Sequence, residues 1–295
     1  MTAYVVTYIS QTADELSDAS VETLCGQLRA MQAAVQRVDR LGPRACDVYV
    51  EGNLEKRALQ EGAVSAVGAD AVLQLASVRG AARRLVVFDM DSTLIEQEVI
   101  ELVARHAGVE PAVKEITDRA MNGELDFKAS LRERVALLAG LDTGGLYDSV
   151  RSELVLTQGA DQLCQLLRES QVSTAVLSGG FVPFAGHIQR VLQLDYMRAN
   201  TLETTPEGIL TGRTLGPVVD GTAKANAVRE LCSELGIDPQ SSVMVGDGAN
   251  DLPAMATAGF GVAWHAKPAV REAAPSQLNG PTLFDVKYVL GYRDT

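Results

Sequence analysis

Two aspartates with one residue between them directly follow an apolar run. The segment RLVVFDMDSTLI spans residues 84–95, so Asp89 and Asp91 end a stretch that is typical of a buried strand. Carboxylates are costly to bury unless a cation or a hydrogen-bond donor accompanies them. Acidic residues after a strand are also common in turns and helix caps, so the pair alone leaves both interpretations open.

Three later segments carry polar groups that favour a functional interpretation of the two aspartates. The segment VMVGDGANDLPAMA is a second apolar strand that ends in an acid, and TAVLSGG ends a third on a hydroxyl and two glycines. A lysine opens the helical pattern AKANAVRELCSELG. The residues concerned are Ser178, Gly179, Gly180, Lys224, Asp247, Asn250 and Asp251. If these strands are parallel neighbours, their carboxyl ends bring these groups into one crevice.

This mixture of groups suits phosphoryl transfer through Asp89. A carboxylate and a phosphate dianion repel each other, so a divalent cation is needed between them, and oxygens of Asp89 and Asp247 suit Mg2+. The Ser178 hydroxyl, the two glycine amides and Lys224 can hold the phosphoryl oxygens while an aspartyl-phosphate forms. Asp91 lies on the same side of an extended chain, where it could protonate the leaving alkoxide and then deprotonate water.

The elements that must position these groups follow a recognisable pattern from Leu85 onward. Short apolar runs, LVVF, STAVLS, SVMVG and GFGVAW, alternate with helical segments, which predicts a doubly wound α/β domain with a parallel sheet over residues 83–295. Residues 89–172 between the first two strands far exceed one crossover helix. We interpret a helix-rich insertion at about residues 97–155 as a cap over the site.

Residues 1–80 form a different pattern, in the order strand, helix, strand, strand, helix, strand. This order predicts a small ferredoxin-like α/β domain similar to the amino-acid-binding ACT domains, and VRGAARR would connect it to the rest of the chain. Three roles stay open for this domain: homodimerisation, binding of an effector such as serine, and a purely structural role.

Composition and charge exclude several classes of protein. With 26 Lys and Arg against 38 Asp and Glu, the formal net charge of −12 argues against a nucleic-acid partner. The four cysteines are far apart and lie in apolar patterns, as buried thiols of a reduced compartment do. The first residues lack a basic signal-peptide region, and the uncharged segment 170–189 is too polar to span a membrane. We therefore expect a cytoplasmic protein that does not bind membranes.

The segments FDMDSTL, VLSGG, Lys224 and GDGAND, in this order, resemble the four motifs of the haloacid-dehalogenase phosphatase superfamily. The resemblance implies that Asp89 is the nucleophile and that Asp91 is the acid and base, with its backbone oxygen on Mg2+. It implies that Asp247 is the remaining metal ligand and Asn250 lies near the phosphate. Asp251 would lie behind the metal ligands, and it could also cap the helix that follows.

Within that superfamily the chain is similar to the phosphoserine phosphatase family. Similarity to it implies that Glu98 binds the substrate ammonium, that Arg134 binds the carboxylate, and that Met121 and Phe127 line the cap. A zwitterionic amino acid does need one anion and one planar cation. Each residue could instead serve ordinary packing or surface roles, and Arg132 is the main rival of Arg134, since only one can face the pocket.

The resemblance as a whole implies Mg2+-dependent hydrolysis of O-phospho-L-serine through an aspartyl-phosphate intermediate, the last step of L-serine biosynthesis. A phosphotransferase that passes the phosphoryl group to another alcohol would share this intermediate and stays open. A regulatory module on an inactive scaffold is disfavoured, because such a scaffold has no need of Asp89, Asp91, Lys224 and Asp247 together.

Overall fold

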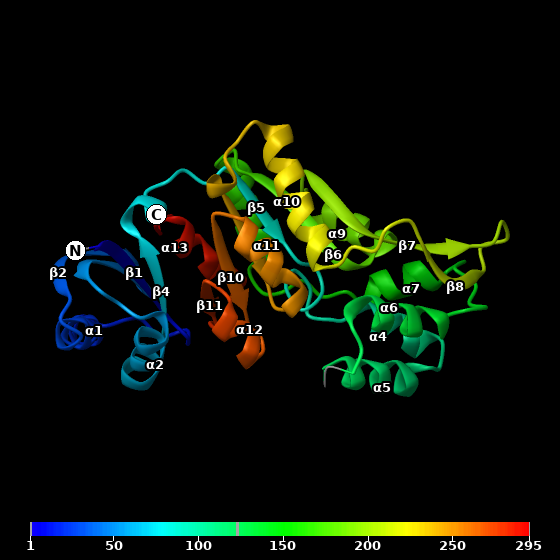
Figure 1. Ribbon diagram of the computed structural model, residues 1–295, viewed down its shortest axis with the longest axis horizontal. Coiled ribbons are helices and arrows are strands. Elements are labelled where there is room, and N and C mark those ends of the chain that lie inside the picture. The colour runs from blue at the N-terminus through cyan, green and yellow to red at the C-terminus, as the bar shows by residue number, and fades with distance from the viewer. Residues whose placement is uncertain (1, 122–123, 295) are drawn as a thin grey trace.

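The computed structural model describes residues 2–121 and 124–294, except for the side chain of Met121. An N-terminal α/β unit, a parallel-sheet core and a group of cap helices follow one another along the long axis (Figure 1). The predicted architecture is confirmed: an α/β core with a mostly parallel sheet accompanies a separate small antiparallel sheet.

The N-terminal unit contains one four-stranded antiparallel sheet, in the order β2-β3-β1-β4. Its elements are β1 (Thr2–Ser10), α1 (Asp18–Ala30), β2 (Ala34–Gly42), β3 (Ala45–Gly52), α2 (Lys56–Val67) and β4 (Ala69–Leu75). Ser17 caps α1 by accepting from the Ser20 amide, and Gly68 ends α2 in the left-handed conformation. The predicted element order is therefore the observed one.

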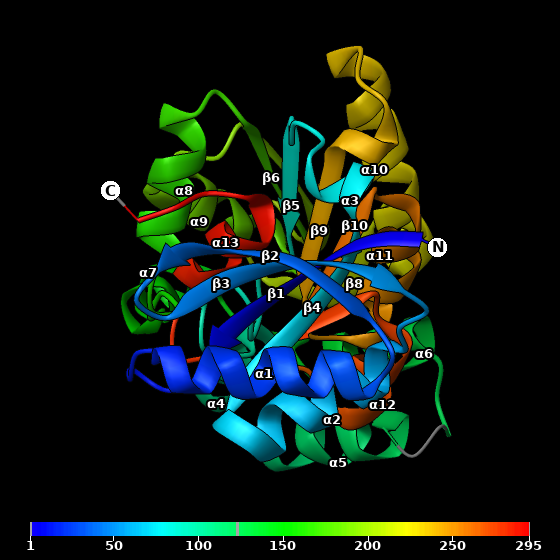
Figure 2. The ribbon, with the colours of Figure 1, turned by 90° about the vertical axis from the view of Figure 1, so that its left-hand side faces the viewer.

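This small sheet is covered on both faces, which explains the continuous apolar run in β1. Helices α1 and α2 cover one face of the sheet (Figure 2), and Val6 and Tyr8 belong to the hydrophobic cluster of these helices. Ile9 and Val72 instead join the hydrophobic cluster that includes Val286 of the core. The N-terminal unit therefore packs against the core through one face of its sheet. Burial of that face removes it from the surfaces available to a partner.

The core contains a seven-stranded sheet in the order β11-β10-β9-β5-β6-β7-β8, parallel except for β8. The strands are β5 (Leu85–Phe88), β6 (Ser173–Phe181), β7 (Tyr196–Thr204), β8 (Leu210–Leu215), β9 (Ser242–Gly246), β10 (Phe260–Trp264) and β11 (Ser276–Leu278). The central strand β5 pairs with β6 on one side and β9 on the other. The strands that carry the motifs are therefore adjacent, and their carboxyl ends meet at one edge.

Helices cover both faces of this sheet. They are α8 (Ala160–Glu169), α9 (Val182–Leu192), α10 (Gly221–Leu235), α11 (Leu252–Thr257), α12 (Pro268–Ala273) and α13 (Val286–Leu290), with 3-10 turns η1 (Pro239–Ser241), η2 (Ala249–Asp251) and η3 (Leu283–Asp285). A short helix in the connector, α3 (Ala76–Arg79), lies instead against β1 and β4 of the N-terminal sheet. The sequence analysis did not predict the β7 and β8 hairpin. Its strands mix exposed polar and buried apolar residues, so they lack the continuous apolar run of the central strands.

The cap consists of α4 (Val99–His106), α5 (Glu110–Met121), α6 (Phe127–Ala136) and α7 (Leu146–Glu153). Two connectors join it to the core, and they pair with each other as a short antiparallel ribbon through Ile95 and Leu156. The Thr157 amide donates to the Leu94 carbonyl at 2.9 Å, which extends this pairing. The entry and exit of the cap therefore lie side by side.

No helix in the described ranges is long and apolar enough to cross a membrane. The four cysteines are all buried and form no disulfide. Burial raises the pKa of Cys46 and of Cys164 to about 12, which leaves both thiols protonated and unreactive at neutral pH.

Candidate active site

The chain turns sharply where β5 ends. The Met90 carbonyl accepts from the amides of Thr93 and Leu94, and Ser92 takes a positive φ of 55°, which is uncommon for a non-glycine residue. Asp89 and Asp91 stand on either side of Met90, whose side chain is fully buried. The turn therefore presents both carboxylates at the carboxyl edge of the sheet, as their spacing predicted.

Lys224 lies at the centre of the site and is completely buried. Its ammonium donates to Asp89 Oδ1 and to Asp251 Oδ1, each at 2.7 Å. Asp220 caps the helix that carries it, by accepting from the Ala223 amide at 2.8 Å. Burial alone would lower the pKa of Lys224, but the neighbouring Asp251 and Asp89 raise it, so the side chain stays charged.

Asp251 takes part in the site more directly than the sequence indicated. Its side chain makes no capping bond to α11; instead it contacts Lys224 and accepts from the Gly248 amide at 3.0 Å. Residue 246 has to be glycine here, since a Cβ at that position would overlap the Asp251 carboxylate. The sequence analysis placed Asp251 behind the metal ligands, but the contact with Lys224 depends on tertiary packing that no local pattern reveals.

Three carboxylates, those of Asp89, Asp247 and Asp251, lie with oxygens within 4.8 Å of one another. Lys224 pairs with two of them, while Asp247 has no ion-pair partner among the described residues and accepts only a 3.4 Å hydrogen bond from Thr93. Burial and the neighbouring Asp89 and Asp251 raise the pKa of Asp247 to about 8. An excess of hard oxygen donors around an unpaired carboxylate fits a divalent cation.

Asp91 points toward the carboxyl end of β6. A Cβ on Gly180 would stand 2.9 Å from Asp91 Oδ2 and 3.0 Å from Ser178 Oγ, so the missing side chain brings these groups close together. Burial, with Glu98 and Asp89 nearby, raises the pKa of Asp91 well above its ordinary value. A carboxyl group in this environment holds a proton more readily than an exposed one.

The Ser178–Gly180 segment at the carboxyl end of β6 is fixed from two sides. Ser178 is fully buried, and its hydroxyl accepts from the Gly180 amide at 2.8 Å. Asn200 on β7 donates to the Gly179 carbonyl at 2.8 Å and accepts from the Val219 amide at 2.8 Å. Sequence reasoning missed Asn200, because its position beside this segment depends on the unpredicted pairing of β7 with β6.

Cap residues complete the wall of the site. The Phe127 ring and the Asn250 amide both lie against Gly179, since a Cβ there would stand 2.8 Å from Phe127 Cζ and 3.6 Å from Asn250 Nδ2. Ser92 donates to Glu98 at 2.8 Å. The structure therefore brings Glu98, Phe127 and Asn250 to the same edge of the sheet as Asp89.

The two candidate arginines differ in direction. Arg132 is exposed, whereas Arg134 is half-buried and its Nε donates to the Ser130 carbonyl of the same helix at 3.3 Å. Burial lowers the pKa of Arg134, and the nearby Glu98, Glu101 and Asp91 oppose that shift. The prediction for the Met121 side chain falls outside the described part of the structure.

Comparison with known proteins gives concordant results. The family model of the haloacid dehalogenase-like hydrolases matches residues 83–259. The phosphoserine phosphatase of Saccharomyces cerevisiae is 46% identical over 292 residues, which cover 97% of this chain and 92% of that protein.

Two solved structures extend this comparison. A probable phosphoserine phosphatase from Vibrio cholerae, in unliganded form, superposes with a TM-score of 0.77 at 33% identity and covers 98% of this chain and 86% of that one. A phospho-aspartyl intermediate analogue of phosphoserine phosphatase superposes with a TM-score of 0.66 at 38% identity and covers 70% of this chain and 99% of that one.

Proposed function

The chain belongs to the phosphoserine phosphatases, a family of haloacid dehalogenase-like hydrolases, and from this premise we propose the roles of its residues. Its reaction is the hydrolysis of O-phospho-L-serine to L-serine and phosphate through an aspartyl-phosphate, the last step of L-serine biosynthesis. The observation that carries the assignment of roles is the completely buried ammonium of Lys224, which holds Asp89 at the carboxyl edge of the sheet.

In the first step the Asp89 carboxylate attacks phosphorus and the bond from phosphorus to the serine oxygen breaks. Asp91 gives a proton to that oxygen as it leaves, which its protonated form suits. The Ser178 hydroxyl and the amides of Gly179 and Gly180 hold the phosphoryl oxygens, with Lys224 and Asn250 beside them. In the second step Asp91 takes a proton from water, which attacks phosphorus and releases Asp89.

The enzyme uses a divalent metal, and we propose Mg2+, held by the side chains of Asp89 and Asp247 and the backbone oxygen of Asp91. When bound, the ion neutralises the repulsion between the Asp89 carboxylate and the incoming phosphate. The unpaired carboxylate of Asp247 supports this assignment, as does the all-oxygen donor set. The pairing of Asp251 with Lys224 makes Asp251 a support for the lysine.

For recognition of the amino acid, we propose that Glu98 binds the substrate ammonium and Arg134 binds its carboxylate. Phe127 and Met121 would supply the apolar lining. The half-buried position of Arg134, in contrast to the exposed Arg132, supports this arrangement, since a zwitterion needs both charges within one small space.

Three broader proposals concern the whole molecule. We propose that residues 1–80 and 83–295 are separate domains, with the cap at about 97–155, and that the protein is cytoplasmic, which its buried free thiols support. A homodimer through the N-terminal domain would use the edge of β2, where Val38 is 39% exposed and no further strand pairs. Light scattering of wild type and Val38→Lys tests this dimer.

Phosphate release from a panel of esters tests the proposed roles. Wild type with Mg2+ should prefer phosphoserine strongly over phosphoethanolamine, which offers Arg134 no carboxylate, and chelator should abolish turnover of both. Adding homoserine as acceptor detects a phosphotransferase through the formation of phosphohomoserine. Equal activity on all esters would refute the roles of Glu98 and Arg134 and leave Asp89 as nucleophile.

A further inference from the structure

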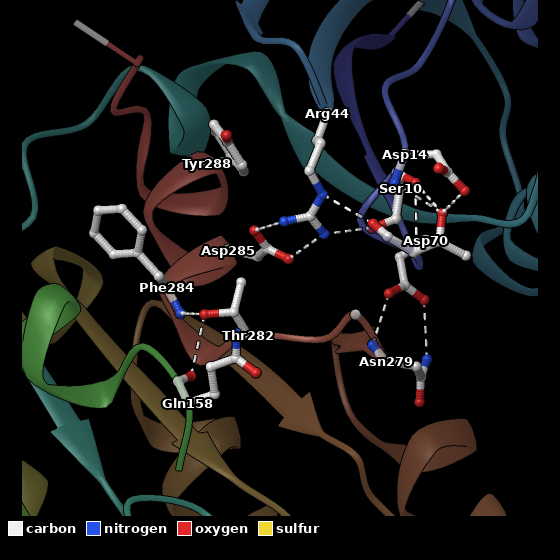
Figure 3. A network of polar contacts seen from close by, with 12 residues as sticks. Ser10, Asp14, Arg44, Asp70, Gln158, Asn279, Thr282, Phe284, Asp285 and Tyr288 are labelled. Atoms are coloured by element: carbon white, nitrogen blue, oxygen red, sulfur yellow. Dashed lines mark hydrogen bonds and ion pairs between the residues drawn. The ribbon is translucent and has the colours of Figure 1, made fainter. Parts of the chain in front are cut away.

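The segment 279–285, which follows β11 and contains η3, is held at both ends by the N-terminal unit (Figure 3). Asp70 accepts from the backbone amide of Asn279 at 2.6 Å and from its side-chain amide at 2.9 Å. At the other end, Arg44 donates to both carboxylate oxygens of Asp285, at 3.0 and 2.9 Å. Residues far apart in the sequence therefore fix this segment against the N-terminal sheet.

The ion pair between Arg44 and Asp285 is largely buried and well hydrogen-bonded. Their side chains are 18% and 3% exposed, and the guanidinium also donates to the carbonyls of Ser10 and Thr12, each at 2.9 Å. A planar guanidinium that satisfies a carboxylate and two carbonyls at once sets the position of each. The N-terminal unit therefore fixes the position of Asp285 and of the 3-10 turn η3 that contains it.

The middle of the same segment contacts the exit connector of the cap. Leu283 donates its amide to the Gln158 carbonyl at 2.8 Å, and the Thr282 hydroxyl donates to the same oxygen at 3.1 Å, as Figure 3 shows. Gly159 has a φ of +82°, and a Cβ there would overlap the Thr282 hydroxyl. This close approach ties the connector to the segment 279–285.

The connector in turn sets where the cap meets the core. The Thr157 amide donates to the Leu94 carbonyl, and Leu156 forms a β-bridge with Ile95. Leu94 and Ile95 lie in the segment that leads from Asp91 to Glu98. A shift of Gln158 would therefore move the ribbon that carries the cap. The cap supplies the side chains proposed to recognise the amino-acid part of the substrate, whereas the core supplies those that act on phosphate.

We propose that Arg44 and Asp285 are positioning residues for substrate recognition. Through the segment 279–285 and Gln158, the N-terminal unit holds the cap in the position where its side chains bind the amino-acid end of the substrate. The inference rests on the proposed function for the identity of that substrate. Loss of the contact should affect esters that the cap must recognise and spare an ester that only the core binds.

The experiment compares phosphoserine with p-nitrophenyl phosphate, which has neither ammonium nor carboxylate, in wild type, Arg44→Met and Thr282→Val. Both variants should raise the KM for phosphoserine by about tenfold, the size of a typical coupling effect, and leave kcat/KM for p-nitrophenyl phosphate unchanged. Asp47→Asn is the matched control, because it breaks a buried ion pair of the same N-terminal unit away from the segment 279–285.

The outcomes separate the possibilities. A selective loss on phosphoserine in both variants, but not in Asp47→Asn, supports the proposal. An equal loss on both esters, or the same selective loss in Asp47→Asn, means that the contact only stabilises the fold and overturns it. A wild type without preference for phosphoserine refutes the proposed function itself. If Arg44→Met does not fold, Thr282→Val alone decides, since it removes one hydroxyl and keeps the ion pair.

Discussion

The molecule contains two buried polar clusters with opposite charge balance. In the first, the single ammonium of Lys224 faces Asp89 and Asp251, with Asp247 beside them and unpaired. The second, at the boundary of the N-terminal unit, pairs Asp285 with Arg44. It also surrounds Asp70 with amide donors from Gln11, Gln60 and Asn279, and a separate ion pair of the same boundary, away from the segment 279–285, joins Asp47 to Arg79.

The difference separates a reactive site from a structural one. A buried charge that has a matched partner holds parts of the fold together, whereas uncompensated negative charge is unfavourable until a cation arrives. Evolution keeps such an excess where chemistry needs it, so the imbalance around Lys224 marks the reaction centre. The two clusters should therefore respond differently to the same chemical change, replacement of a carboxylate by an amide.

The largest effect is expected at Asp89. Asp89→Asn should lower kcat for phosphoserine by about 10^4-fold or more, because an amide is a poor nucleophile toward phosphorus. The rate of phosphate release at saturating substrate measures it, with folding checked by circular dichroism. Turnover within tenfold of wild type would mean that another group attacks phosphorus.

The matched change in the balanced cluster should affect stability alone. Asp47→Asn leaves the buried guanidinium of Arg79 without a charge partner, since Arg79 donates to Asp47 at 2.5 Å, and should cost about 3 kcal/mol of unfolding free energy. Urea denaturation measures this loss. A denaturation midpoint of Asp47→Asn equal to that of wild type, or a changed kcat in the folded variant, would contradict the view that this cluster is structural and the Lys224 cluster is reactive.

A cation should stabilise only the unbalanced cluster. With Mg2+ at about 100 times its dissociation constant, wild type should gain about 2.7 kcal/mol, whereas Asp247→Asn should gain little. In chelator, Asp247→Asn should be at least as stable as wild type, because it removes a buried carboxyl group whose ionisation is unfavourable in the folded state, as its raised pKa shows. Thermal unfolding of both proteins with and without Mg2+ tests this; equal stabilisation of both would place the cation elsewhere.

The smallest effect is expected at a neutral contact. Asn200→Ala removes the hydrogen bonds to Gly179 and Val219 and should cost about 1 to 2 kcal/mol of unfolding free energy. Because the Ser178–Gly180 segment that Asn200 supports is proposed to hold phosphoryl oxygens, KM should rise for every ester alike. An effect confined to phosphoserine would assign Asn200 to recognition of the amino acid instead.

The sequence predicted the parts of the site that local pattern controls. Asp89, Ser178 and Asp247 each end an apolar run, and the ends of parallel strands converge whatever their separation along the chain. The order of elements in residues 1–80 was predictable for the same reason, because alternation and turns are local signals.

The remaining contacts depend on tertiary packing. Arg44 and Asp285 are 241 residues apart and lie in segments without chemical motifs, so only the packed structure pairs them. Asn200 lies on β7, and the mixture of exposed polar and buried apolar residues in β7 gives no clear strand pattern in the sequence. The difference in burial between Arg134 and Arg132 likewise depends on the orientation of α6, since both residues lie on this helix.

Chemical trapping of the phosphorylated enzyme tests the central claim most directly. Wild type mixed with phosphoserine and Mg2+, quenched in acid and reduced with borohydride, should carry homoserine in place of aspartate at position 89, because borohydride reduces an acyl phosphate to the alcohol. Peptide mass spectrometry locates the change. Homoserine at Asp91 or Asp247, or none in an enzyme that turns over normally, would contradict the account.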